Sequence, residues 1–346
     1  MAFNSARFSL TMRWMFVVAV LAVPQVVLAQ AQWQATVGAQ SKDKGHQALA
    51  FLPNEIWIHA GDSITWTFVT DEIHTVSFLR PGQTRLPFQM GCPGFSLGGS
   101  ATFDGSTCVT TGPLVKEQTF TVTFLATGNF KLVCLVHVDM TGVVHVLDRS
   151  ATLPHDQDFY DDQAAEERHD LLSDTDKSIH HDHDGNHERD DSDRTRSPEN
   201  QVTAGVAEIS ATAGGPQTVA LMRFVEPTTV IHAGETVEWS NLGPVTAHTI
   251  TFGIEPANPM PPSANVTLDA DGARHAVIDS PADSVNSGFI TAAPQERVGL
   301  PQSLLPPSLG GTVTRFRVTF THPGVYPYIC ALHDDLGMKG KVIVLP

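Results

Sequence analysis

The sequence predicts an all-β protein built from two Greek-key β-sandwich domains, and three observations support this prediction. Short stretches rich in Val, Ile, Thr, Phe and Trp recur along both halves of the chain, with Gly, Asp, Asn or Pro between them. Many short strands at such spacing, without a sustained helical period, are typical of β-sandwiches. The chain also repeats itself, and its 346 residues are enough for two domains with their own cores.

The repeat is visible before any fold is assumed. The stretch from Ile58 to Trp66 matches the stretch from Ile231 to Trp239, since both have His-Ala-Gly followed by an acidic residue and end in Trp. An internal duplication of this length indicates two copies of one structural unit.

Each copy carries the same set of metal-binding side chains. In the second half, Cys330, His333 and Met338 fall in one short loop, and His248 lies well upstream in a strand-like stretch. A blue-copper site needs a thiolate, two imidazoles and a weak axial thioether, which is this set of donors. The first half has the same order of donors, at His74, Cys134, His137 and Met140.

Both halves resemble the cupredoxins, the plastocyanin, amicyanin and pseudoazurin group of small copper proteins. The short Cys-x-x-His-x-x-Met loop of the first half resembles amicyanin, and the longer loop of the second half resembles plastocyanin and pseudoazurin. The resemblance implies a type 1 copper in each domain, held by the eight residues above. It also implies that the loop histidines His137 and His333 reach the surface as electron ports. The Asn or Asp that donates to the thiolate in the family is replaced by Ile73 and Ala247.

Residues 1–31 are predicted to be a secretory signal peptide. Two arginines precede an apolar run from Trp14 to Leu28, and the small residues Ala29 and Ala31 offer a cleavage site. The run is short for a membrane span, which needs about 20 apolar residues. We therefore expect export to the periplasm or beyond, without stable membrane insertion, and an uncleaved anchor is the less favoured alternative.

Residues 32–148 are predicted to form the first sandwich. The stretch from Arg80 to Pro113 is an insertion, expected on the surface near the copper end. The predicted strands of this domain are Phe51–Ile58, Ser63–Val69, His74–Leu79, Gln118–Leu125, Gly128–Val133 and Gly142–Leu147.

The resemblance also sorts the four cysteines. Once Cys134 and Cys330 are assigned to copper, Cys92 and Cys108 are the pair left for a disulfide, which an exported setting permits. In the chain-entropy model a loop of this length is worth about 3 kcal/mol.

Residues 149–204 are predicted to be an acidic, His-rich linker. From Asp148 to Glu199 there are 17 acidic and 6 basic residues, which accounts for most of the formal net charge of −16. The stretch Asp156–Ser173 has the pattern of a short amphipathic helix, and Asp174–Asn200 that of a disordered tether. We interpret the histidines of this tether as part of a charged segment exposed to solvent. Weak metal binding at His180, His181, His183 and His187 is the alternative.

Residues 205–346 are predicted to repeat the sandwich. A long, proline-rich connection separates the upstream histidine from the later strands. The predicted strands are Ala207–Ala211, Gln217–Phe224, Thr229–His232, Thr236–Ser240, His248–Phe252, Arg274–Ile278, Thr312–Phe320, Gly324–Cys330 and Gly340–Leu345.

These observations predict an exported electron carrier that meets redox partner proteins transiently. Copper buffering or delivery uses the same ligands and is the main alternative. Nucleic acid is excluded as a partner because no basic cluster is present to neutralise phosphates.

A two-domain multicopper oxidase or nitrite reductase is the less favoured alternative. Those enzymes need further histidines beside the ligand cysteine. Here Val133 and Leu135 flank the first cysteine, and Ile329 and Ala331 flank the second. Five other histidines are interpreted as structural, namely His59, His145, His232, His275 and His322.

Overall fold

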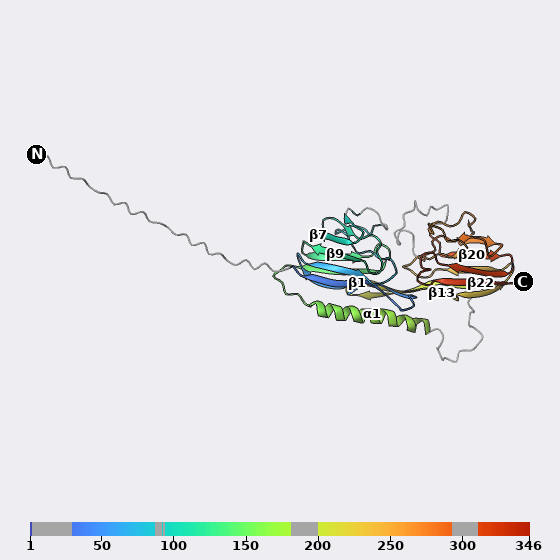
Figure 1. Ribbon diagram of the computed structural model, residues 1–346, viewed down its shortest axis with the longest axis horizontal. Coiled ribbons are helices and arrows are strands. Elements are labelled where there is room, and N and C mark those ends of the chain that lie inside the picture. Colours follow the sequence, from blue (N-terminus) through green and yellow to red (C-terminus); the bar gives the residue numbers. More distant parts are fainter. Residues whose placement is uncertain (2–29, 87–91, 93, 181–199, 293–310) are drawn as a thin grey trace. The chain divides into compact units, whose positions relative to one another are not determined.

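The computed structural model contains two β-sandwiches, which confirms the predicted all-β class (Figure 1). We call residues 32–147 the N-terminal sandwich and residues 201–345 the C-terminal sandwich. The predicted signal peptide falls almost entirely outside the described residues. No helix of the described chain is long and apolar enough to cross a membrane. The structure describes residues 1, 30–86, 92, 94–180, 200–292 and 311–346.

The N-terminal sandwich packs two layers of strands around a core. One layer has the order β2-β1-β4-β9-β7 and the other β3-β11-β10-β5-β8-β6. The strands are β1 (Gln32–Gln40), β2 (His46–Leu52), β3 (Glu55–His59), β4 (Ser63–Phe68), β5 (Ser77–Phe78), β6 (Gly94–Phe95), β7 (Gly99–Phe103), β8 (Val109–Thr110), β9 (Thr119–Phe124), β10 (Gly128–Val133) and β11 (Thr141–Leu147).

The C-terminal sandwich repeats this arrangement. Its layers have the orders β13-β12-β15-β20-β18-β17 and β14-β22-β21-β16-β19. The strands are β12 (Gln201–Thr212), β13 (Gly215–Val225), β14 (Thr228–His232), β15 (Thr236–Ser240), β16 (Thr251–Phe252), β17 (Thr267–Leu268), β18 (Arg274–Ile278), β19 (Val285–Asn286), β20 (Arg315–Phe320), β21 (Gly324–Ile329) and β22 (Lys339–Leu345).

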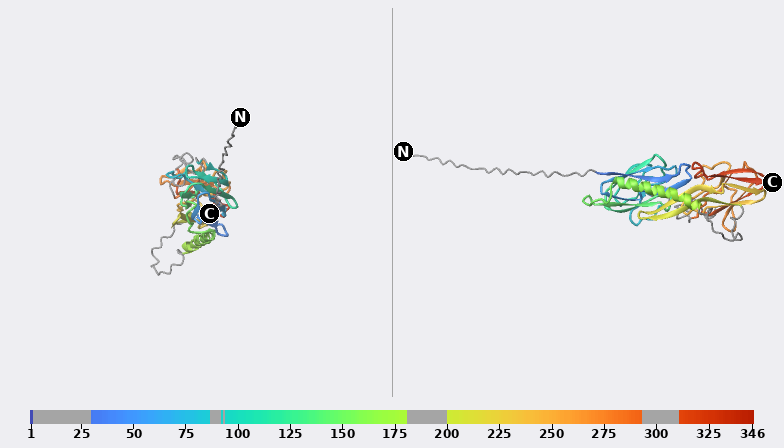
Figure 2. Two further views of the ribbon diagram at one scale, coloured as in Figure 1. Left: turned by 90° about the vertical axis from the view of Figure 1, so that its left-hand side faces the viewer. Right: turned by 90° about the horizontal axis from the view of Figure 1, so that it is seen from below.

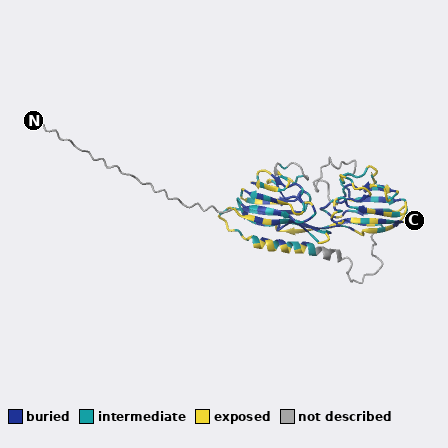
Figure 3. Ribbon diagram, viewed as in Figure 1, coloured by how far each residue is buried: buried dark blue, intermediate teal, exposed yellow. Residues whose placement is uncertain are grey.

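Alternation of side chains along each strand builds the two cores. On β4, Ile64, Trp66 and Phe68 are buried and the residues between them are half-buried, as a period of two requires. β15 places Trp239 in the same way, and both tryptophans are fully buried. Figure 3 shows buried residues alternating with less buried ones along the strands of both sandwiches.

The two sandwiches share one sheet. β2 pairs with β13 in antiparallel fashion, with Leu49 opposite Thr218 and Ala48 opposite Val219, so that the two inner layers join into eleven strands. Equivalent strands follow in the same order on both sides of this pair, with β17 added at the outer edge of the C-terminal layer, which gives the junction the pattern of a two-fold axis. The pairing also satisfies two sheet edges that would otherwise be open.

One helix, α1 (Gln157–His180), lies across the shared sheet (Figure 2). Asp156 caps it, because its carboxylate accepts the N–H of Phe159 at 3.1 Å. Tyr160, Ala164 and Leu171 are buried. The predicted helix is therefore present, but it extends to His180 and so occupies the start of the stretch predicted as a disordered tether. The rest of that stretch, residues 181–199, lies outside the described residues.

Candidate metal centres

The fold brings the predicted donors together in both sandwiches. Cys134 follows β10 directly, and the turn to β11 carries the loop histidine and methionine. His74 lies just before β5, held by backbone hydrogen bonds to Leu114. His248 has the same place before β16, where it bridges to Ile290. In each sandwich the Cys and two His donor atoms lie within 4.8 Å of one another.

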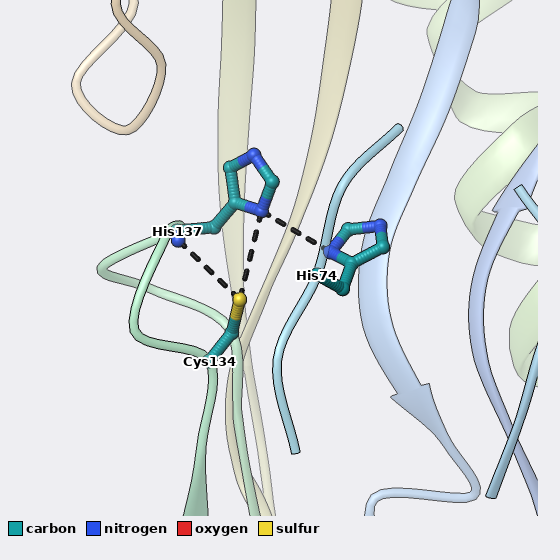
Figure 4. Close-up of side chains that lie close together, drawn as sticks. All are labelled: His74, Cys134 and His137. Carbon is teal, nitrogen blue, oxygen red and sulfur yellow. Dashed lines mark hydrogen bonds between the residues drawn. The ribbon is translucent and has the colours of Figure 1, made fainter. Parts of the chain in front are cut away.

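In the N-terminal centre the two imidazoles face each other through Nδ1 (Figure 4). His74 Nδ1 lies 3.2 Å from His137 Nδ1, which in turn lies 3.8 Å from Cys134 Sγ. All three side chains are buried. Two ring nitrogens and a sulfur that converge on one point are a donor set that could hold a metal ion, and copper is bound by such a set.

The C-terminal centre has the same geometry. His248 Nδ1 and His333 Nδ1 are 3.1 Å apart, and Cys330 Sγ lies 3.3 Å from His333 Nδ1 and 3.8 Å from His248 Nδ1. A point about 2.0 Å from all three atoms lies at the centre of this triangle, and metal bonds to imidazole nitrogen and thiolate have about this length.

A backbone hydrogen bond closes each ligand loop. The N–H of Cys134 donates to the carbonyl of Met140 at 3.0 Å, and the N–H of Cys330 donates to the carbonyl of Met338 at the same distance. Both methionines are fully buried. The two loops therefore end in the same way although the second is two residues longer.

Backbone N–H groups approach each sulfur from the upstream strand. Thr75 N and Thr249 N lie 3.4 Å from Cys134 Sγ and Cys330 Sγ, respectively. The backbone N–H of the residue after each histidine therefore donates to the sulfur, in place of the side chain that Ile73 and Ala247 do not supply. The His-Thr pair that both halves share was the signal that could have revealed it.

The environment of Cys134 favours the thiolate. Burial alone would raise the pKa of its thiol, but hydrogen bonds with His137 and His74 outweigh burial and hold the pKa well below its usual value. Burial lowers the pKa of His74, which keeps that imidazole neutral. Burial likewise lowers the pKa values of His248 and His333. Burial would also lower the pKa of His137, but hydrogen bonds with Cys134 and Glu72 outweigh burial and raise the pKa to about 9. A thiolate and neutral imidazoles are the protonation states that bind a metal ion, so a metal ion bound at the N-terminal centre would displace a proton from His137.

A bulged glycine lies behind each upstream histidine. The pairing of β1 with β2 shifts register around Gly38, and the pairing of β12 with β13 shifts around Gly205. Both glycines have positive φ, +71° and +75°, which only glycine adopts without strain. The bulges bring the backbone close to the rings of His74 and His248.

The prediction that the loop histidines reach the surface is wrong. His137 is only 2% exposed and His333 only 3%. Both Nε2 atoms face the same carboxylate, Glu72, at 3.2 Å and 3.6 Å. Four buried residues of the C-terminal sandwich, Ala220, Met222, Val245 and Leu336, join the core cluster of the N-terminal sandwich. The two ligand loops are therefore covered at the junction between the sandwiches.

The insertion after His74 reaches the N-terminal centre, as predicted. Arg85 donates to the carbonyl of Cys134 at 2.9 Å. The insertion also contains the predicted disulfide between Cys92 and Cys108, whose Cα atoms are 5.5 Å apart.

The five histidines interpreted as structural bind protein groups. His59 Nε2 lies 2.9 Å from the carbonyl oxygen of Ala151, and His232 Nδ1 lies 3.9 Å from Glu235 Oε2. The other three form side-chain contacts within hydrogen-bonding distance, His145 with Glu55, His275 with Asp269 and His322 with Thr321. Of the His-rich stretch, His180 ends α1, and His181, His183 and His187 lie outside the described residues.

The comparison with protein families points to copper binding in the second half of the chain. Residues 207–345 match the family model of copper binding proteins of the plastocyanin/azurin family. No curated protein matches the chain.

Three solved structures illustrate the similarity. Oxidised plastocyanin from Dryopteris crassirhizoma is 18% identical, with 42% of this chain and 99% of that chain covered and a TM-score of 0.21. Amicyanin from Paracoccus versutus is 19% identical, with 35% and 86% covered and a TM-score of 0.24. A purple cupredoxin from Nitrosopumilus maritimus is 19% identical, with 33% and 99% covered and a TM-score of 0.23. With the family match in its second half, its paired β-sandwiches and its duplicated Cys-His-His centres, the chain is cupredoxin-like.

Proposed function

We propose that the protein is an exported type 1 copper protein that carries single electrons, with one centre in each sandwich. One observation supports this proposal above all: the same buried triangle of two Nδ1 atoms and one sulfur occurs twice. The ligands would be His74, Cys134, His137 and Met140 in one centre, and His248, Cys330, His333 and Met338 in the other.

These donors suit copper in both of its oxidation states. Thiolate and thioether favour Cu(I), and imidazole serves Cu(I) and Cu(II), so that bound copper would exchange one electron. The chain's own contribution is to hold the donors still. Buried rings, closed loops and N–H groups directed at each sulfur leave them little freedom to rearrange.

A copper titration of the mature protein tests the proposal. We expect two equivalents of copper to give an intense thiolate-to-copper absorption band and a type 1 electron paramagnetic resonance signal. Cys134→Ser and Cys330→Ser should each remove about half of the band, because each cysteine serves one centre. Copper binding without the band, or a further stoichiometric type 2 signal, would overturn the proposal.

The rate of copper release separates electron transfer from copper delivery. A carrier should retain copper through repeated cycles of oxidation and reduction in the presence of a competing chelator. Release of Cu(I) within one cycle would instead support buffering or delivery.

Export has its own test. Expression of the whole chain in a bacterium should yield a periplasmic protein whose N-terminus, determined by mass spectrometry, lies close to residue 32. Retention of residues 1–31 on the purified protein would contradict export with cleavage.

A further inference from the structure

We propose that Glu72 couples the two metal centres, because its carboxylate lies between the loop histidines of both sandwiches, close to Nε2 of each ring. The inference rests on the proposed function, since it requires metal in both centres. It adds a residue outside both ligand sets and makes the two centres one interacting pair.

The contacts of Glu72 carry this inference. Oε1 lies 3.2 Å from His137 Nε2, and Oε2 lies 3.6 Å from His333 Nε2. Glu72 is 5% exposed, and within the described part of the chain its ion-pair partners are these two histidines. A buried carboxylate is costly unless it is paired, so its position between two rings is a specific arrangement.

Nearby side chains fix the backbone of Glu72 in this position. The N–H of Glu72 donates to Thr70 Oγ1 at 2.8 Å, and that hydroxyl donates to Gln47 Oε1 at 2.8 Å.

The second copy of the repeat lacks this carboxylate. Thr246 stands two residues before His248, where Glu72 stands two residues before His74. Its hydroxyl is buried without a hydrogen-bond partner among the described residues. One carboxylate therefore serves both centres.

This arrangement has two consequences. A histidine whose Nε2–H points at a carboxylate keeps Nδ1 free to bind a metal ion, so Glu72, 3.2 Å from His137 Nε2, is a positioning residue for the N-terminal centre. The same carboxylate places negative charge 3.6 Å from His333 Nε2 in the C-terminal centre. The two loop histidines also compete for the carboxylate of Glu72. More positive charge on the ring of His137 strengthens its N–H as a donor, which draws the carboxylate away from His333 and leaves that ring with less negative charge beside it.

The variant Glu72→Gln tests the coupling in the copper-loaded full chain. An amide offers one acceptor oxygen and one NH₂ group, so it can accept from only one of the two rings. Loss of the negative charge should raise both midpoint potentials, because a carboxylate stabilises the more positive oxidised form. We expect at least a tenfold change in the redox equilibrium constant at each centre, which is about 59 mV for a one-electron couple.

Asp71→Asn is the matched control. It removes the same charge at the adjacent residue, but Asp71 binds Gln40 and Lys44 on a partly exposed surface. In this variant the redox equilibrium constant of each centre should change by less than twofold. Equal shifts of the midpoint potentials in the two variants would show that any lost charge has this effect, and would overturn the inference.

A second measurement needs no change at Glu72. The midpoint potential of the C-terminal centre should be lower in Cys134→Ala, where the N-terminal centre lacks its thiolate, than in the wild type with an oxidised N-terminal centre. Equal potentials would overturn the coupling. Both measurements start from a wild type with two blue centres, so a protein without them contradicts the proposed function and not the coupling alone.

Discussion

Gly205 lies so close to the ring of His248 that a methyl group on its Cα would overlap Nε2. Gly38 has a similar relationship to His74, where a Cβ atom would come within 2.9 Å of Nε2 and would also overlap the side chain of Thr70. The bulge glycines therefore set how far each upstream histidine can withdraw from its centre.

Gly205→Ala should weaken the C-terminal centre alone. The added methyl group must displace His248, so we expect at least a tenfold loss of copper affinity there, measured by competition with a chelator of known affinity. At a chelator concentration that leaves the wild type loaded, about half of the visible band should disappear. Gly38→Ala should have the mirror effect on the N-terminal centre.

Gly272→Ala controls for backbone strain. Gly272 also has positive φ, +83°, but no atom lies within 4 Å of the position of a Cβ. It should cost about 1 kcal/mol in the free energy of unfolding and leave both centres intact. A full copper band in Gly205→Ala would contradict the proposed role of the bulge.

Thr75→Val should loosen the N-terminal ligand loop. Thr75 Oγ1 accepts the backbone N–H of Leu135 at 2.7 Å, and valine leaves that buried N–H unpaired. We expect a loss of about 1–3 kcal/mol in the free energy of unfolding of the copper-free protein, measured in urea. Thr249→Val should behave alike, because Thr249 Oγ1 accepts the N–H of Ala331 at 2.7 Å.

The control for these variants is Thr119→Val, at an exposed position of β9. Its effect should stay within about 0.5 kcal/mol. If Thr75→Val were equally mild, the hydroxyl would not be what ties the upstream strand to the loop.

Tyr160→Phe should weaken the attachment of α1. The phenol oxygen accepts the N–H of Trp57 at 2.9 Å and is itself buried. Phenylalanine leaves that N–H without its acceptor, at a cost of about 1–3 kcal/mol. Limited proteolysis should then cut within α1 faster than in the wild type, whereas Phe159→Leu, on the exposed face, should not change the rate.

Removal of the disulfide should destabilise the chain without removing either centre. The double variant Cys92→Ala/Cys108→Ala opens a loop with a sequence separation of 16, which is worth about 3 kcal/mol. Unfolding in urea should shift accordingly, with both copper bands retained. Loss of the N-terminal band would show that the insertion determines the geometry of that centre.

Most of both centres could be predicted from the sequence because three of the four ligands in each centre lie close together along the chain. Cysteine, loop histidine and methionine lie within one turn, and β10 and β18 were predicted with the right bounds. β1 was missed because its stretch mixes glutamine with small residues, and its burial comes from the sheet around it. Pro53 divides the predicted strand Phe51–Ile58 into β2 and β3, since proline cannot donate to the ladder.

Burial of the loop histidines could not be predicted in this way. The resemblance concerns single sandwiches, whereas the covering of His137 and His333 depends on the pairing of β2 with β13, residues far apart in the sequence. Glu72 was missed because only the junction reveals its two partners. The two copies of the repeat differ at this position, with Glu72 in one and Thr246 in the other, and this difference could have pointed to Glu72.

The junction through β2 and β13 has the symmetry of a homodimer, but one polypeptide forms it. In a dimer of identical chains, any residue at the interface appears twice, so a glutamate at position 72 would bring a second buried carboxylate to the same two rings. Like charges so close together, away from water, would repel each other and take up protons. Because the two copies are fused in one chain, their sequences can differ. A single carboxylate can therefore occupy a place where two-fold symmetry would require two.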